Sequence, residues 1–193
     1  MQNIHSASEE YGLSLNASKT KWMIISKRQH PPMRLTINGQ DIDQVETYTY
    51  LGTTVNAKWD QASEIRSRIE KARAAFNNMK KLFTSKDISL QLKLRLVRCY
   101  VFSVLFYGVE AWTTTEATLK KLESFEMWIY RRILKIPWTD HITNVEVMRR
   151  LEKEKEVIFT LKKRKLEYFG HILRHDKYRL LQLIVQGRVD SKR

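Results

Sequence analysis

The sequence predicts an α+β fold in which a small N-terminal antiparallel β/α region precedes a mainly α-helical body. Two observations predict this division. β-branched and aromatic runs with turn residues between them extend to about residue 60, and apolar residues then recur at helical spacing of three to four. The charge changes at the same place: residues 1–60 carry six Lys/Arg and six Asp/Glu, so the net charge of +14 belongs entirely to residues 61–193.

The first elements of the N-terminal region are a helix and a strand. Residues 2–11 are predicted to form a short helix that ends at Gly12, because glycine readily adopts the left-handed conformation found after helix ends. The run from Thr20 to Ser26 is β-branched and aromatic and predicts a strand.

Two further strand predictions depend on glycines. Asn38-Gly39 predicts a hairpin between residues 35–37 and a strand that starts at Ile42, since both turn residues tolerate positive φ. The run from Tyr48 to Val55 predicts one more strand, in which Gly52 marks a bulge or a close backbone approach.

Helices are expected from residue 61 onward. An apolar stripe at helical spacing runs through Ile65, Ile69, Ala72, Phe76, Met79 and Phe83. Residues 85–107 are ambiguous, because the segment from Leu90 to Leu96 alternates as a strand does. The lack of Gly and Pro up to residue 107 and the abundance of Leu, Lys, Gln and Arg favour a helix, with Ser85 or Asp87 as N-cap and one face formed by Leu92, Leu96, Cys99, Tyr100, Ser103 and Phe106.

Four more helices complete the prediction. One covers residues 116–135, with Thr115 as cap, Pro137 as terminator and an inward face of Leu119, Leu122, Phe125, Trp128, Ile129 and Ile133. The others cover residues 143–151, 153–174 and 177–186, the last ending at Gly187. The predicted organisation is therefore an α/β region at 1–60 and helical regions at 61–135 and 136–193.

The concentrated positive charge predicts a polyanionic partner, because a lopsided basic field attracts nucleic acid over long range. Arg66, Arg73 and Lys80 recur every seven residues beside the apolar stripe, where a row of bases can follow phosphates. Two alternatives stay open. The charge can serve solubility alone, and these side chains can lie at the edge of a buried face with only their charged ends in water.

A second basic candidate is the run Lys162, Lys163, Arg164 and Lys165. Four consecutive residues cover a full helical turn, so at least one of them faces away from solvent. This predicts a phosphate contact or a nuclear-localisation patch, and the alternative is a solvated helix face. Most tryptophans and tyrosines fall on apolar stripes and are interpreted as core.

No catalytic residue and no metal site are predicted. Asp41 and Asp43 are close in sequence but lie beside a turn, where aspartate is common. His171 and His175 can share one helix face, yet the possible further ligands His141, Asp176 and Cys99 have no diagnostic spacing. We interpret the histidines as one packed and one exposed side chain. The sequence also contains no phosphate-binding loop and no GxSxG or HExxH motif.

The single cysteine, Cys99, excludes an internal disulfide and fits a reducing compartment, the nucleus or the cytoplasm. It lies in an apolar run, where a thiol is expected to be buried and inert. The N-terminus has no signal-peptide pattern. The most apolar run, from Val97 to Trp112, contains charged residues and is too short to span a bilayer, so no membrane association is expected.

Several motifs, in order along the chain, resemble those of the non-LTR (LINE-type) retrotransposon reverse transcriptases. Residues 11–21, YGLSLNASKTK, resemble the palm segment "GL.lN..KT" that follows the catalytic carboxylates, and residues 50–52 resemble the "YLG" primer-grip strand. Residues 106–112 and 168–174 resemble the downstream patterns "l.YG.e.W" and "..GH..R". Residues 186–188 resemble the start of a Gly/Arg-rich stretch, so the match covers essentially the whole chain.

The resemblance implies that residues 1–60 are the end of a palm with a primer-grip-like hairpin, 61–135 a thumb-like region and 136–193 a post-thumb region. Lys19 would then lie near the phosphates of the incoming nucleotide. Tyr50, Leu51 and Gly52 would hold the primer end.

The implied partner is an RNA/DNA template–primer duplex, bound without sequence preference, and the oligomeric state is left open. The palm carboxylates that bind Mg²⁺ in these enzymes, and any endonuclease domain, would belong to a longer parent, upstream of Met1. We therefore expect no cofactor and no polymerase activity in this chain alone. The alternative is a decayed or co-opted copy that acts as a protein-interaction module.

Overall fold

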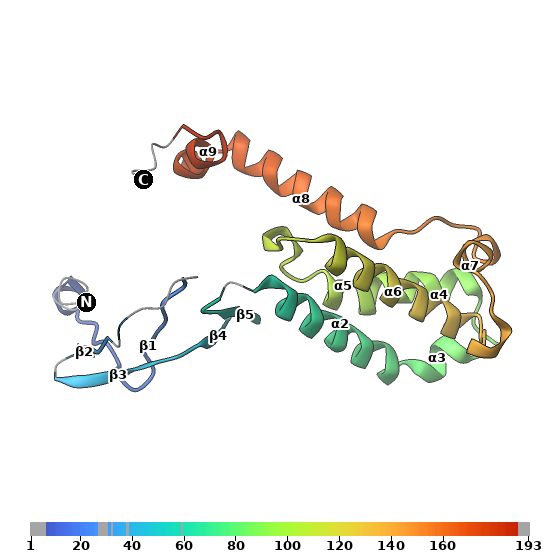
Figure 1. The fold of residues 1–193 in the computed structure, drawn as a ribbon, viewed down its shortest axis with the longest axis horizontal. Helices are drawn as coiled ribbons and strands as arrows, with labels where there is room; N and C mark the ends of the chain where they lie inside the picture. Colours follow the sequence, from blue (N-terminus) through green and yellow to red (C-terminus); the bar gives the residue numbers. More distant parts are fainter. Residues whose placement is uncertain (1–6, 27–30, 32, 38, 59, 189–193) are drawn as a thin grey trace. The chain divides into compact units, whose positions relative to one another are not determined.

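The computed structural model describes residues 7–26, 31, 33–37, 39–58 and 60–188. The chain divides into two compact units, Met1–Glu64 and Ile65–Arg193, which we call the N-terminal unit and the helical unit. Strands occupy the first and helices dominate the second (Figure 1), so the predicted α+β class is confirmed.

A three-stranded sheet forms the centre of the N-terminal unit. Its strands are β1 (Lys21–Trp22), β2 (Leu35–Ile37) and β3 (Gln40–Gln44), in the order β1-β3-β2. β2 pairs antiparallel with β3, and Gly39 in the turn has φ +75°, so the hairpin prediction is confirmed, although Asn38 lies outside the described residues. β1 pairs with β3 in parallel, which makes the sheet mixed rather than purely antiparallel.

Two strand predictions in this unit were wrong in extent. The predicted strand at residues 20–26 is only two residues long, because only Lys21 and Trp22 find partners on β3. The predicted strand at residues 48–55 is instead a hairpin of β4 (Thr47–Tyr50) and β5 (Thr53–Asn56). Leu51 and Gly52, with φ of 48° and 78°, form its turn, and positive φ at both central residues reverses the chain where one strand was expected.

The predicted N-terminal helix is present at residues 7–10, and residues 2–6 lie outside the described part. Gly12 has φ +68° and ends it as expected. The amide of Gly12 donates to the Glu9 carbonyl and that of Leu13 to the Ser8 carbonyl, both at 2.9 Å. These two bonds are the pattern of a glycine-terminated helix.

The segment that alternates as a strand does is helical, as predicted. The structure has α2 (Gln61–Asn78), α3 (Lys80–Thr84), α4 (Leu90–Leu96), a π-helix η1 (Val97–Phe102) and α5 (Ser103–Leu105). The N-cap of α4 is Ser89, whose hydroxyl accepts from the Leu92 amide at 3.3 Å, rather than Ser85 or Asp87. The Ser85 side chain instead accepts from the amide of Asp87 in the preceding turn.

The buried face of α2 matches the predicted stripe, whereas the face predicted for residues 92–106 is wrong except at Leu96, which is partly buried against the core, and at Phe106. Leu92, Cys99, Tyr100 and Ser103 are exposed. The hydrophobic residues that are buried in this segment are Leu94, Val97, Val101, Phe102, Leu105 and Phe106. The segment is apolar at every second position from Leu90 to Leu96, so its pattern fits more than one helical face and the sequence does not decide which one is buried. The expectation of a buried Cys99 thiol is therefore wrong as well.

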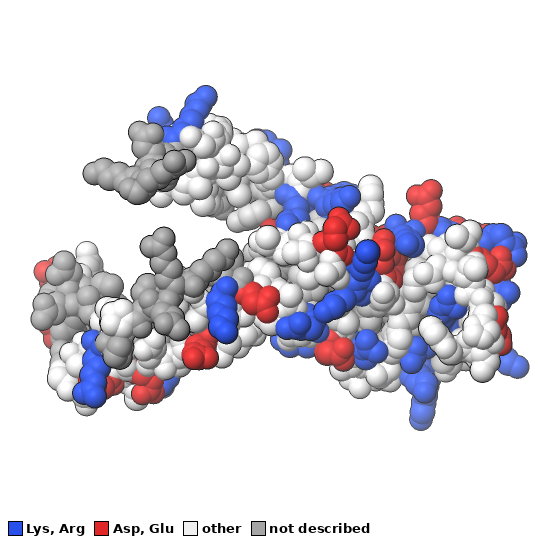
Figure 2. Space-filling view, in the orientation of Figure 1, with Lys and Arg blue, Asp and Glu red and all other residues white. Residues whose placement is uncertain are grey.

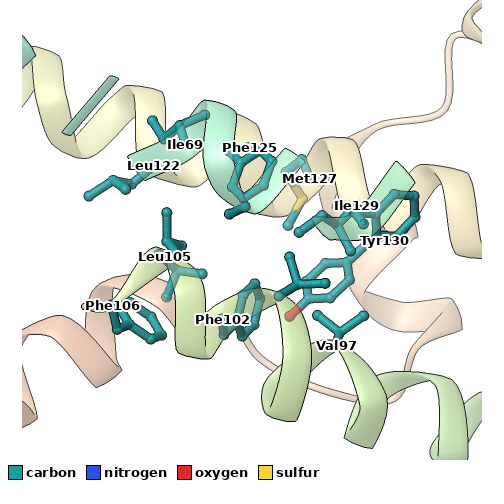
Figure 3. Packing of buried hydrophobic residues seen from close by; sticks show 14 of the residues in the cluster. Ile69, Val97, Phe102, Leu105, Phe106, Leu122, Phe125, Met127, Ile129 and Tyr130 are labelled. Atoms are coloured by element: carbon teal, nitrogen blue, oxygen red, sulfur yellow. The ribbon is translucent and has the colours of Figure 1, made fainter. Parts of the chain in front are cut away.

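Helix α6 (Glu116–Ile133) lies at the centre of the helical unit. Thr115 caps it through a capping box with Thr118, as predicted for that position. Its inward residues are buried or partly buried as expected. Figure 3 shows Leu122, Phe125 and Tyr130 of α6 facing Val97, Phe102 and Leu105 of the segment from η1 to α5. α6 ends at Ile133, and Lys135, with φ +56°, reverses the chain two residues before Pro137.

The predicted C-terminal helices are α7 (Asn144–Arg150), α8 (Val157–Arg174) and α9 (Arg179–Val185). Short 3-10 turns occur as η2 (Val109–Ala111), η3 (Trp138–Asp140) and η4 (Asp176–Tyr178). Gly187, with φ +66°, follows α9 as predicted. Among the described residues, no helix combines the length and the apolar character needed to cross a membrane.

Candidate nucleic-acid interface

Lys19 projects from a tight turn organised by Asn16. The Asn16 side-chain oxygen accepts from the Lys19 amide at 3.1 Å, and its backbone carbonyl accepts from the Thr20 amide at 2.9 Å. Asparagine commonly bonds to the backbone of such turns. The turn accounts for the asparagine and for the threonine, whose hydroxyl donates to the Asn16 carbonyl at 2.8 Å, and it leaves the Lys19 side chain exposed.

Tyr50, Leu51 and Gly52 form the tip of the β4–β5 hairpin. The Tyr50 and Leu51 side chains are 64% and 72% exposed. Leu51 has a left-handed backbone, which is uncommon for a residue with a branched side chain and is found most often where function or packing demands it. An exposed apolar side chain in a strained turn is suited to contact a partner molecule.

The predicted row of bases is divided by the structure. Arg66 and Arg73 lie on α2 and line a hollow of about 470 Å³ against α6, where Lys121 faces them. Lys80 is exposed at the start of α3 and is not part of this lining. The remaining lining residues are Ile69, Glu70, Ser124, Phe125 and Trp128.

Two guanidinium groups lie over the Trp128 indole. Arg132 is centred 3.9 Å and Arg73 4.7 Å from a Trp128 ring centroid. The indole in turn stacks on Phe125 at 5.6 Å and meets the edge of Phe76 at 5.2 Å. Burial and the nearby charge of Arg73 both lower the pKa of Arg132. Cation–π attraction thus holds two like charges near one ring, and an anion bound beside them would relieve their repulsion.

A second hollow, of about 790 Å³, continues from the first and shares Ser124 and Trp128 with it. Its other lining residues are Met127, Arg131, Arg132, Ile136, Trp138 and Asn144. We call the two together the α2–α6 groove. Five of its lining residues are cationic and one, Glu70, is acidic, which is the kind of lining that binds phosphates.

The run of four bases on α8 splits between solvent and protein. Lys162 and Lys163 are exposed. Arg164 donates to the Phe106 carbonyl at 3.3 Å and lies 5.3 Å from the centre of its ring, and Lys165 donates to the Trp112 carbonyl. Two of the four therefore join α8 to the segment around η2, as expected for a helix with one side against protein. Figure 2 shows Lys and Arg over much of the helical unit, with Asp and Glu interspersed.

A second group of polar and charged side chains holds helices together around the fully buried Glu126 and Tyr130. Tyr130 donates its hydroxyl toward Glu126 and Glu156, each at 3.0 Å, and accepts from Lys153 at 2.7 Å. Arg98 forms an ion pair with Glu156 at 2.8 Å. One oxygen of the fully buried Glu126 has no hydrogen-bond partner in the described structure, and burial raises the pKa of this carboxyl.

The histidines and aspartates considered as metal ligands do not form a metal centre. The His171 and His175 rings are 4.3 Å apart and share a face with Tyr178, 5.5 Å from His171. Asp43 forms an ion pair with Lys21 across β1 and β3. Within the described ranges, no three His, Cys, Asp or Glu side chains gather closely enough to hold a metal ion.

Sequence patterns did not single out Lys121, Trp128, Arg132 or Trp138 as site residues. Trp128 lies on the inward stripe of α6, so the sequence indicates a core residue. Its partly exposed edge lines the hollow only because α2 packs beside α6, and the sequence does not show that packing. Trp138 was detectable, because it follows Pro137 outside every apolar stripe. A tryptophan there has no reason to be core, and it is in fact 86% exposed.

The chain is similar to proteins of mobile elements. It shares 28% identity with a transposon-derived protein of Caenorhabditis elegans, over 97% of this chain and 69% of that protein. It shares 24% identity with the RNA-directed DNA polymerases from mobile element jockey of Drosophila funebris and Drosophila melanogaster, over 71% and 72% of this chain.

The chain spans 15% of the length of each of these polymerases. No protein-family model matches the chain, and no solved structure matches it. These similarities give the chain a retrotransposon-related origin.

Proposed function

We propose that this chain corresponds to the end of the palm, the thumb and the post-thumb region of a LINE-type retrotransposon reverse transcriptase, and that its helical unit binds template–primer duplex without sequence preference. The observation that carries the proposal is the α2–α6 groove, with five cationic side chains and one acidic one in its lining. The similarity to the jockey polymerases supports it, because those proteins are named as RNA-directed DNA polymerases.

The spacing of the groove cations suits a nucleic-acid backbone. Arg66 and Arg73 are seven residues apart on α2, which corresponds to about 10 Å along a helix. Nucleotides of one duplex strand advance about 3.4 Å each, so the two guanidiniums span about three nucleotides. Lys121 faces the same hollow from α6. Phosphate contacts of this kind release counterions and supply affinity rather than sequence choice.

The test compares two double variants with the same loss of charge. Arg66→Gln with Lys121→Gln removes two groove cations, whereas Lys71→Gln with Lys120→Gln removes two exposed lysines that lie on the same helices outside the groove lining. Binding to a mixed-sequence RNA/DNA duplex is measured by fluorescence anisotropy at several salt concentrations. We expect wild-type affinity to fall steeply with salt and to be the same for unrelated sequences.

The groove double variant should bind more weakly and lower the magnitude of the salt slope by about 1 per residue, while the control double stays near wild type. Absent or salt-insensitive binding would contradict the proposal. Equal loss in both doubles would instead mean that the charge acts as a diffuse field and that the groove is not the contact surface. Polymerisation by this chain alone is outside the proposal, and a primer-extension assay with Mg²⁺ tests it separately.

A protein-interaction role is the second candidate, and exposed apolar side chains favour it. On α8 and α9 these include Phe159, Leu166, Phe169, Leu173, Leu180 and Ile184, each at least 40% exposed. In the N-terminal unit, Tyr11, Leu13 and Tyr48 are also exposed. Apolar patches of this kind often mark protein contacts. Self-association in light scattering, together with no affinity for nucleic acid, would favour this role over the first.

A further inference from the structure

Trp138 is the most exposed large hydrophobic side chain among the described residues, at 86%. It lies in the 3-10 turn η3, between Pro137 and the left-handed residue His141. A tryptophan exposes a large apolar area to water at a cost, and aromatic side chains in such positions are enriched where molecules bind. Core packing does not account for this residue.

The loop that carries Trp138 is fixed against α6 at both of its ends. At its start, the Ile136 amide donates to the Arg131 carbonyl at 2.9 Å. At its end, the Arg131 guanidinium donates to the Ile142 carbonyl at 2.7 Å and to the Asn144 side-chain oxygen at 2.9 Å. The exposed indole therefore lies on a loop that hydrogen bonds hold in place, and α6 sets the position of Trp138 relative to the groove.

The hollow beside Trp138 is basic and aromatic. Arg131, Arg132 and Trp128 line it, and no acidic side chain is among its lining residues. Its volume of about 790 Å³ lies in the range of small-ligand sites. A positively charged groove with aromatic side chains is the combination that binds single-stranded nucleic acid, since cations attract the phosphates and rings stack on the bases.

We propose that the Trp138 end of the α2–α6 groove binds unpaired nucleotides adjoining a bound duplex, with the Trp138 indole stacked on a base and Arg132 near the phosphate backbone. The inference rests on the proposed function and adds a single-stranded segment to the ligand. It assigns the two halves of the groove different tasks. The hollow at Arg66, Arg73 and Lys121 contacts duplex phosphates, and the hollow at Trp138 contacts unpaired bases.

The experiment measures binding of a blunt duplex and of the same duplex with a short single-stranded extension at either its 5′ or its 3′ end. Trp138→Ala removes the stacking surface, Trp138→Phe keeps a ring, and Phe159→Ala is the control, because Phe159 is 69% exposed on α8 and outside the groove lining. A single-stranded oligo-dT titrated against tryptophan fluorescence measures the site without any duplex.

We expect one of the extensions to raise wild-type affinity by about tenfold, as the stacking of a base on an aromatic ring can supply. Trp138→Ala should lose this gain, Trp138→Phe should retain most of it, and Phe159→Ala should behave as wild type. Blunt-duplex binding should be similar in all four proteins, and oligo-dT should quench the fluorescence of wild type more than that of Trp138→Ala.

The outcomes separate this inference from the proposed function. Blunt-duplex binding with no gain from either extension, or a gain that survives Trp138→Ala, overturns the inference and leaves the duplex proposal intact. Trp138-dependent binding of oligo-dT without duplex binding overturns the proposed function and keeps the single-strand site. Binding of neither probe overturns both.

Discussion

The helical unit and the N-terminal unit are stabilised in different ways. Among the described residues, 24 buried hydrophobic side chains lie in the helical unit and two, Ile37 and Ile42, lie in the N-terminal unit. The helical unit also carries the positive charge, since residues 1–60 are neutral overall. One unit thus combines a large core with a basic surface, while the other has short strands, tight turns and a small core.

The size of the core beneath each proposed contact determines how rigid that contact is. The groove residues Arg73, Trp128 and Arg132 rest on aromatic rings that are part of the core, so their positions are fixed by packing. Lys19 and Leu51 are held by turns with few hydrogen bonds, in a unit with only two buried hydrophobic side chains among its described residues. Local opening costs little free energy where few apolar contacts must separate. We expect the groove to be preformed and the hairpin tip to depend on its surroundings.

Hydrogen exchange should show the largest contrast between the units. Amides of α6, such as those of Leu122 and Ile129, should exchange only through global unfolding of the helical unit, whereas amides of β2, β3 and β5 exchange through local opening. With ordinary domain stability the rates should differ by at least about a thousandfold. Mass spectrometry of deuterated peptides measures this, and equal protection in the two units would contradict the contrast.

Truncation of a core ring should have the next largest effect. Phe76 is fully buried and stacks on Phe83 with ring centroids 4.6 Å apart. Phe76→Ala should lower the free energy of unfolding by about 3–5 kcal/mol in urea titrations followed by circular dichroism. Ile42→Ala, in the other unit, should leave that main transition in place. A comparable loss in both variants would mean that the two units unfold as one.

The pH dependence of stability should come from the buried cluster of the helical unit. Burial raises the pKa of Glu126, so the folded protein holds this proton at pH values where the unfolded chain has lost it. The stabilisation is complete below the ordinary pKa of 4.5 and is lost as the pH rises through the folded pKa. Glu126→Gln should therefore be more stable than wild type at pH 8, by about 1–3 kcal/mol, and similar to it near pH 4.

The matched control for this variant is Glu156→Gln. Although burial opposes it, hydrogen bonding to Lys153 and Arg98 lowers the pKa of Glu156, so this carboxylate stabilises the fold above pH 4.5 and loses that effect as the pH falls. Glu156→Gln should thus destabilise the protein at pH 8, with the opposite sign to Glu126→Gln. Urea unfolding at both pH values checks the two signs, and equal signs would contradict this account.

The sequence predicted most helices, because a stripe such as Ile65, Ile69 and Phe76 reflects burial against a single core. It failed where the pattern fits two faces and where a turn is not signalled by its residues. Residues 90–96 are apolar at every second position and fit more than one helical face, and the left-handed pair Leu51-Gly52 turned an expected strand into a hairpin. Of the cations in the first hollow, the sequence singled out Arg66 and Arg73, because they share one helix. Lys121 joins them only through tertiary packing, which the sequence pattern does not show.

The smallest predicted effect concerns the strained turn of the N-terminal unit. Leu51 has φ +48°, and an Asn-Gly pair is the sequence that such a turn favours. Leu51→Asn should therefore stabilise the β4–β5 hairpin, by about 0.5–1 kcal/mol, since a left-handed residue with a branched side chain costs about that much or more. Slower exchange of the β4 and β5 amides would show it.

Leu51→Asn also tests whether the strained turn contributes to binding. Its exposed side chain is a proposed primer contact, so the variant should bind template–primer more weakly even though its turn is more stable. The matched comparison is Leu13→Asn, an exposed leucine in the same unit outside the hairpin tip. If Leu51→Asn stabilises the hairpin and leaves affinity unchanged, the strain has no role in binding and the contact belongs to the helical unit alone.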